Sequence, residues 1–153
     1  MKENSFNYKV LAIFIFGFGL LMFERGFFWT KEQNTVLSDS DFYITLHQVM
    51  PIWLWGVLGM LFSLFIILAP IFLPKQQVNN KFNFLLIFGG SGNAIYYFLL
   101  TSASIFNAIN WLSPVQFATL AMINALIAYY GGADVAGKRW AFRIKGRMDR
   151  QHK

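Results

Sequence analysis

The chain has 153 residues, of which 56% are hydrophobic, 19% are aromatic and only 13% are charged. It contains no cysteine, and its 13 lysine and arginine residues outnumber its 7 acidic residues. This composition excludes a disordered chain, a disulfide scaffold and a thiolate metal site. It also argues against an ordinary soluble domain, in which about a quarter of the residues are charged.

Four long apolar stretches follow one another along the chain, at residues 10–29, 49–73, 84–106 and 114–131. Only the first contains charged residues, Glu24 and Arg25. Each comes close to the roughly 17–25 residues that a helix needs to cross a bilayer. None shows the polar face, recurring about every 3.6 residues, that a helix of a soluble bundle presents. We therefore predict an all-α, polytopic integral membrane protein whose residues 1–132 form a four-helix transmembrane bundle.

The charges that flank these stretches predict their orientation. Eleven of the 13 cations lie before the first stretch, between the second and third, or after the fourth. The segments on the other side hold only Arg25 and Lys31, together with four of the seven acids. Because cytoplasmic flanks carry an excess of lysine and arginine, we expect a multi-pass cell-membrane protein with both termini in the cytoplasm.

The outer ends of the predicted helices carry most of the tryptophans, Trp29, Trp53, Trp55 and Trp111. Indole rings prefer the headgroup level, where the ring is half buried and the N–H meets water. The outer loop 30–48 is polar and long enough for a short helix of its own. The fourth helix is expected to begin at Ser113-Pro114, with Ser113 as its cap.

Two asparagines, Asn93 and Asn124, fall inside uncharged stretches at similar depth. The loop before the fourth stretch is short, so these two helices should be antiparallel neighbours. A hydrogen bond between the asparagines would help to hold the helices together, and we favour this interpretation. The alternative is a polar lining for a pore or a ligand site. Tyr96 and Tyr97 also lie in mid-membrane, where at least one hydroxyl needs a partner.

Small residues mark the faces through which the helices are expected to pack. Gly89, Gly90 and Gly92 permit either close approach of a neighbour or a break in the helix, and we expect close packing because the chain has a single such cluster. In the fourth stretch, a stripe of alanines steps by three and four residues: Ala118, Ala121, Ala125 and Ala128. Such stripes let helices associate in lipid, within one chain or between chains.

Residues 133–153 form a basic tail. Apolar side chains recur at four-residue spacing among six cations: Lys138, Arg139, Arg143, Lys145, Arg147 and Arg150. This pattern predicts a short amphipathic helix on the anionic inner leaflet, where each cation near the surface is worth about 1 kcal/mol. We expect lipids rather than nucleic acid as the partner, because the cluster follows directly on a predicted spanning helix.

The sequence shows little sign of catalysis, metal binding or cofactor binding. Neither histidine has a metal-ligand companion at helical spacing, and no nucleophile neighbours a base. Glu24 and Arg25 are expected at headgroup level, with Arg25 extending toward water. An outer-surface cluster of Glu24, Asp39, Asp41 and His47 is the remaining enzymatic alternative. We therefore expect a non-enzymatic protein without a cofactor.

Small size, several spans, small-residue faces and a basic tail are similar in general layout to a phage holin. This resemblance rests on layout alone and implies a self-associating protein that permeabilises the membrane. The usage of Phe, Ile, Asn and Lys is compatible with an AT-rich bacterial or phage genome. One alternative is an accessory or scaffold subunit that docks a membrane partner. The other is a channel or transporter subunit that uses Asn93 and Asn124.

Overall fold

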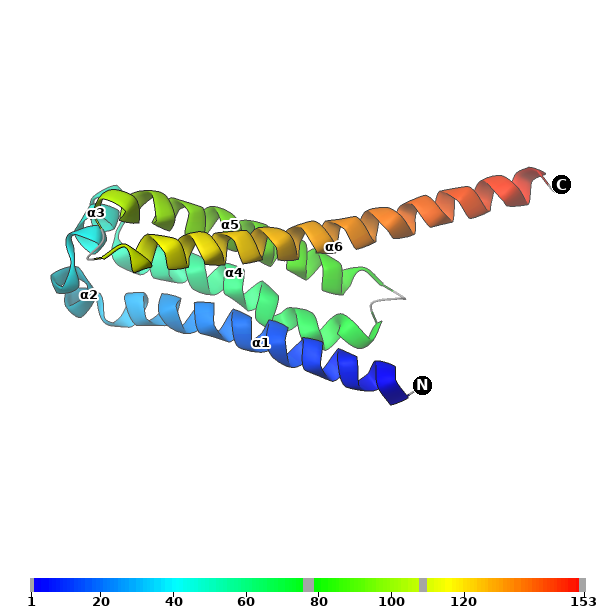
Figure 1. The fold of residues 1–153 in the computed structure, drawn as a ribbon, viewed down its shortest axis with the longest axis horizontal. Coiled ribbons are helices and arrows are strands. Elements are labelled where there is room, and N and C mark those ends of the chain that lie inside the picture. The colour runs from blue at the N-terminus through cyan, green and yellow to red at the C-terminus, as the bar shows by residue number, and fades with distance from the viewer. Residues whose placement is uncertain (1, 76–78, 108–109, 152–153) are drawn as a thin grey trace.

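In a computed structural model of the chain, all regular secondary structure is helical within the described residues. The structure describes the backbone of residues 2–75, 79–107 and 110–151, with the side chains of 6–74, 79–107, 110–138 and 140. In chain order the elements are α1 (Lys2–Lys31), α2 (Gln33–Asp39), α3 (Asp41–Val49), α4 (Ile52–Phe72), the short 3-10 helix η1 (Leu73–Lys75), α5 (Lys81–Asn107) and α6 (Leu112–Gln151) (Figure 1).

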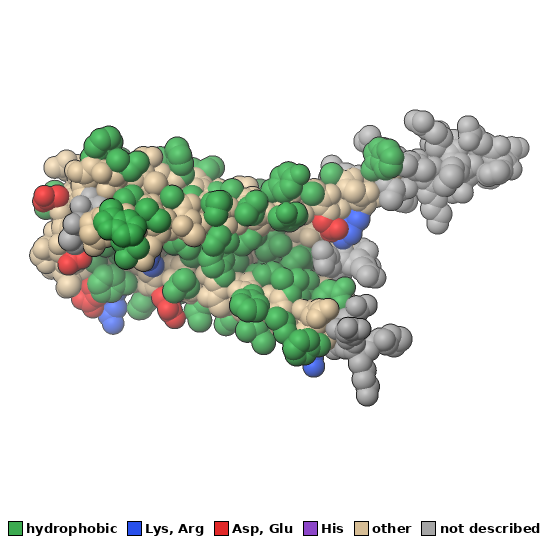
Figure 2. Space-filling model, viewed as in Figure 1, with side chains coloured by type: hydrophobic (Ala, Val, Ile, Leu, Met, Phe, Trp, Pro, Cys, Tyr) green, Lys and Arg blue, Asp and Glu red, His purple; other side chains and the backbone are tan. Residues whose placement is uncertain are grey.

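Four of these helices are long and apolar enough to cross a membrane, over Phe6–Lys31, Ile52–Phe72, Lys81–Asn107 and Leu112–Lys138. They overlap the four apolar stretches, so the prediction of four such helices is confirmed. Figure 2 shows hydrophobic side chains over the long sides of the helices and charged side chains toward their two ends. This distribution suits apolar surroundings along the sides and water at the ends.

The long helices pack in chain order, with α1 along α4, α4 along α5 and α5 along α6. The short helices α2 and α3 lie across one end, which we call the capped end (Figure 1). The start of α1 and the extension of α6 lie at the opposite end, which we call the terminal end. In the part of the chain that the structure describes, α1 and α6 do not pack along each other, and they diverge toward the terminal end.

The start of α6 differs from the predicted one. The side-chain oxygen of Asn110 accepts hydrogen bonds from the backbone N–H groups of Leu112 (3.0 Å) and Ser113 (3.3 Å). Asparagine is a strong N-terminal capping residue because its oxygen pairs with otherwise unpaired N–H groups of the first turn. The assignment of Ser113 as the cap is therefore wrong. Asn110 performs that role, and the helix begins one residue before Ser113.

The basic tail is helical, but it is not a separate helix. α6 runs without a break from Leu112 to Gln151 and projects beyond the other helices at the terminal end (Figure 1). The expected short helix over residues 133–153 is thus the last part of a 40-residue helix. The predicted outer-loop helix corresponds to two short helices, α2 and α3.

Glycines lie where α5 meets both of its neighbours. A Cβ atom on Gly90 would lie 2.8 Å from the backbone oxygen of Asn124 on α6. A Cβ atom on Gly89 would lie 2.8 Å from Cγ1 of Ile66 on α4, and Gly92 faces the ring of Phe62 on the same helix. α5 is continuous through these glycines, so they allow close packing and do not break the helix.

A contact of backbone against backbone joins α1 to α4. A Cβ atom on Gly56 would lie 2.5 Å from the carbonyl oxygen of Gly26, and one on Gly26 would lie 2.6 Å from the carbonyl oxygen of Gly56. The two backbones therefore touch directly, which only residues without a side chain permit.

We expect Gly56→Ala to lower the free energy of unfolding by about 1–3 kcal/mol, because the added methyl group forces two backbones apart. Gly17→Ala is the matched control, since nothing lies within 4 Å of a Cβ atom at Gly17 and alanine favours a helix by about 1 kcal/mol. Denaturant unfolding of both variants in detergent micelles measures the difference. Equal stability of the two variants would contradict the close contact between α1 and α4.

Candidate functional site

Aromatic side chains fill the interior at the capped end. The rings of Trp55 and Tyr96 lie 6.1 Å apart, and those of Tyr97 and Phe117 lie 6.2 Å apart. Three apolar residues of α2 and α3 complete this core: Val36, Phe42 and Leu46. The short helices therefore close the capped end with an apolar, largely aromatic layer, which we call the aromatic layer.

The tryptophans expected at headgroup level divide into two groups. Trp53 and Trp111 are exposed near the capped end, as the expectation requires. Trp29 and Trp55 are instead buried in the aromatic layer, with 2% and 7% of their surface exposed. The indole N–H of Trp55 donates to the carbonyl oxygen of Leu46 on α3 (3.1 Å). The hydrogen-bond partner that water was expected to provide therefore comes from α3.

Polar side chains from all four long helices face the interior next to the aromatic layer. They are Arg25 on α1, Ser63 on α4, Asn93 and Tyr96 on α5, and Asn124 on α6. The last four have 0–4% of their surface exposed. We call these five residues the polar interior. Sequence analysis singled out Asn93, Tyr96 and Asn124 for their polarity in mid-membrane, but it did not place Arg25 or Ser63 with them.

Contacts between the helices place these residues at neighbouring depths. A Cβ atom on Gly59 would lie 3.1 Å from the Tyr96 hydroxyl, and Ser63 follows Gly59 by one turn on the same face of α4. Asn93 precedes Tyr96 by one turn of α5. On the other side, the amide of Asn124 contacts the sulfur of Met22 at 3.2 Å.

Arg25 points into the protein. Its guanidinium carbon lies 5.2 Å from the centre of the Phe117 ring on α6, a distance typical of a cation–π contact. Its charge also acts on the hydroxyl groups of Tyr43, Tyr96 and Tyr97. The side chain is half-buried, and its contact with Phe117 on α6 is a partner that the expected extension toward water did not include. The neighbouring Glu24 is exposed.

Each residue of the polar interior has a buried atom without a hydrogen-bond partner among the described residues: Arg25 Nη1, Ser63 Oγ, Asn93 Nδ2 and Oδ1, Tyr96 Oη and Asn124 Oδ1. The amide of Asn124 donates instead to Leu120 within its own helix (2.8 Å) and to Met22. The expected hydrogen bond between Asn93 and Asn124 is thus not formed. Because buried polar groups are almost always paired, these atoms are placed to bond water or a solute.

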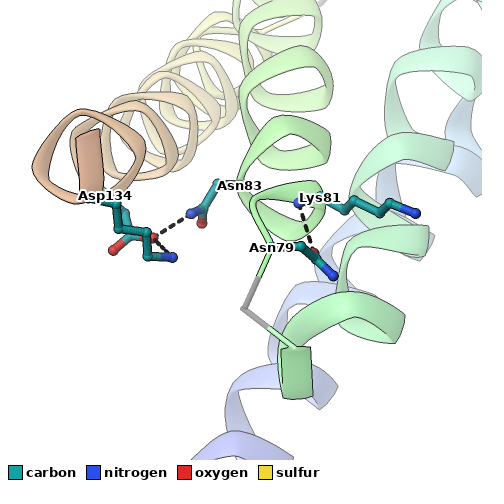
Figure 3. A network of polar contacts seen from close by, with 5 residues as sticks. Asn79, Lys81, Asn83 and Asp134 are labelled. Carbon is teal, nitrogen blue, oxygen red and sulfur yellow. Dashed lines mark hydrogen bonds and ion pairs between the residues drawn. The ribbon is translucent and has the colours of Figure 1, made fainter. Parts of the chain in front are cut away.

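A groove with a volume of about 380 Å³ opens between α1, α5 and α6 toward the terminal end. Its walls are mostly apolar and include Leu11, Ile15, Leu86, Ile123 and Ile127. At its polar end the amide of Asn83 donates to the carboxylate of Asp134, which pairs with Lys138 at 2.8 Å (Figure 3). Ile123, in the wall of this groove, is the chain neighbour of Asn124 in the polar interior.

The outer-surface cluster of the enzymatic alternative consists of residues that lie in different surroundings. His47 accepts a hydrogen bond at Nδ1 from the backbone N–H of Ile52 (3.3 Å), so it supports the start of α4. Asp39 and Asp41 are exposed beside a shallow cleft. Within the described residues, no group of three or more His, Asp or Glu side chains could hold a metal ion. Burial and the charge of Asp39 raise the pKa of the Tyr43 phenol, while the charge of Arg25 opposes this shift.

The alanine stripe of α6 divides between two faces. Ala121 and Ala128 are partly buried, and Ala128 lies against Gly90 of α5. Ala118 and Ala125 are exposed, and nothing lies within 4 Å of a Cβ atom on Gly132. In the basic tail, Lys138 pairs with Asp134, whereas five side chains lie outside the described residues: Arg139, Arg143, Lys145, Arg147 and Arg150.

Comparison of the chain with protein-family models, with curated proteins and with solved structures found no match. Its function is therefore inferred from its own residues. The polar interior offers hydrogen-bond donors and acceptors around a positive charge, within helices that are long and apolar enough to cross a membrane.

We expect Asn93→Leu to leave the free energy of unfolding unchanged or to raise it, because an apolar side chain replaces two unpaired buried atoms. Asn83→Leu is the contrasting variant. It removes the donor to Asp134 and should cost about 1–3 kcal/mol. Denaturant unfolding in micelles compares the two. A loss for Asn93→Leu as large as that for Asn83→Leu would show that Asn93 already has a partner in the folded protein.

Proposed function

We propose that this chain is a non-enzymatic membrane protein that passes a small polar solute through its interior, as a channel or transporter subunit. The observation that carries the proposal is the set of buried, unpaired polar atoms contributed by four long helices. Polar groups inside a membrane are expensive and mark solute pathways by default. Asparagines that only held helices together would be bonded across the helix contact, and Asn93 has no such bond among the described residues.

In this proposal the four long helices form a bundle across the cell membrane, with both termini in the cytoplasm. Two observations support the orientation. The start of α1 and the extension of α6 share the terminal end (Figure 1), and the described segments at that end contain ten of the 13 cations. The bilayer is then the principal partner, and the basic tail binds anionic lipids of the inner leaflet.

The proposed pathway has two closed points. We place the first at the contact between Met22 and Asn124, on the groove side of the polar interior, and rupture of this contact would admit a solute from the terminal end. The aromatic layer closes the other side, so passage requires movement of α2 and α3 as a lid. Methionine suits the first point, because its flexible, unbranched side chain can change conformation at low cost.

We expect Asn93→Leu to lower solute flux about tenfold or more at unchanged protein abundance, because it removes a polar group from the pathway. Ser91→Leu is the matched control, since Ser91 lies two residues away on the exposed face of the same helix. Efflux of potassium and chloride from proteoliposomes is the measurement. Equal flux in the Asn93→Leu variant and the wild-type protein would refute the pathway.

A second candidate is holin-like permeabilisation by a self-associating bacterial or phage protein. The observation in its favour is the unpartnered face of α6, where Ala118 and Ala125 are exposed beside open space at Gly132. A second copy of the chain can approach closely along such a face. The same face would serve an accessory subunit that docks another membrane protein.

For this candidate we expect Ala125→Leu to abolish self-association and the abrupt depolarisation that follows induction in bacteria, because the larger side chain blocks close helix approach. Met122→Leu, a change of similar volume at an exposed position of α6, is the control. The measurement is timed induction of each variant in bacteria, with membrane potential and potassium efflux recorded together. Depolarisation that survives Ala125→Leu excludes this face, and a silent, well-expressed wild-type protein favours the accessory role.

A further inference from the structure

The unpaired buried atoms of the polar interior include more donors than acceptors. Arg25 Nη1 and Asn93 Nδ2 only donate, and the hydroxyl groups of Ser63 and Tyr96 can donate. The two amide oxygens of Asn93 and Asn124 only accept. Arginine keeps its proton at any physiological pH. A cation would meet repulsion at such a site, whereas an anion would find a charge and several donors.

Within the described residues, no carboxylate forms an ion pair with the guanidinium of Arg25. Asp134 pairs instead with Lys138, near the terminal end. The adjacent Glu24 is exposed, and the ring of Phe117 is the close partner of the guanidinium. Arg25 is half-buried, and its Nη1 is buried without a hydrogen-bond partner among the described residues, a cost that a cation–π contact offsets only in part. A bound anion would supply the missing charge.

We propose that the solute held in the polar interior is a small monovalent inorganic anion of the chloride type, bound by Arg25 with hydrogen bonds from Tyr96 and Asn93. This proposal rests on the proposed function and names its substrate class. A single guanidinium matches a single negative charge.

The charge distribution of the whole chain supports the same ion. Ten of the 13 cations belong to described segments at the terminal end, toward which the groove opens. An excess of positive charge on one side of a pathway raises the local concentration of anions there. The described acids at the capped end, Glu32, Asp39 and Asp41, are exposed on the far side of the aromatic layer.

The first experiment measures binding without transport. The full chain in neutral detergent is unfolded by heat in chloride and in gluconate at equal ionic strength. A ligand that binds only the folded protein raises the midpoint of unfolding, so we expect a higher midpoint in chloride for the wild-type protein and for Arg25→Lys. Arg25→Gln should abolish the difference. Lys31→Gln, which removes an exposed cation from the end of α1, should retain it.

The second experiment measures chloride and potassium efflux from proteoliposomes. We expect chloride efflux in the wild-type protein, lowered about tenfold or more by Arg25→Gln and unchanged in Lys31→Gln, because the charge of Arg25 would be the main attraction for the ion. Potassium efflux without chloride efflux would overturn the anion assignment and leave the proposed function standing. Chloride-dependent unfolding without efflux of either ion would support the anion site and overturn transport. Equal midpoints of the wild-type protein in chloride and gluconate would overturn the anion site, even if Arg25→Gln fails to fold.

Discussion

Direct backbone contact at glycines is the constraint on which the rest of this structure depends. In apolar surroundings the helices gain little from burying hydrophobic side chains against one another, so close packing has to hold them together. Gly26 and Gly56 bring α1 onto α4, and Gly89 and Gly90 bring α5 onto α4 and α6. These contacts set which face of each helix turns inward, and therefore which polar side chains lie in the interior.

The polar interior is a consequence of that packing. Gly59 lies against Tyr96, and Gly90 lies against Asn124. Ser63 lies one turn after Gly59 on α4, and Asn93 lies one turn after Gly90 on α5, so both of these side chains also face the interior. None of these side chains completes its hydrogen bonds with another described residue. A protein that needed only stability would place apolar residues of similar size there, because an unpaired buried polar atom costs about 1–3 kcal/mol. A solute that forms hydrogen bonds with these atoms would remove this cost.

The two ends of the interior are closed by different means. At the capped end, aromatic rings and the apolar residues of α2 and α3 form a layer that excludes water. Toward the terminal end, Asn124 of the polar interior contacts Met22, and the neighbouring Ile123 lines the groove. The groove exists because α1 and α6 diverge there. In the proposed function, the groove would admit a solute from one side, and α2 and α3 would act as a lid on the other.

The sequence by itself determined the four long helices, the glycine and alanine faces and the polarity of Asn93 and Asn124. Apolar length and residue size are local properties, and they can be counted along the chain. Only the tertiary structure decided the direction of Arg25, because its partner Phe117 is 92 residues away on a helix that α1 barely touches. It also decided that Asn93 and Asn124 do not bond each other, that Trp29 and Trp55 are buried, and that Asn110 caps α6. Each of these outcomes depends on the rotation of one helix against another, and local sequence leaves that rotation open when every face is apolar.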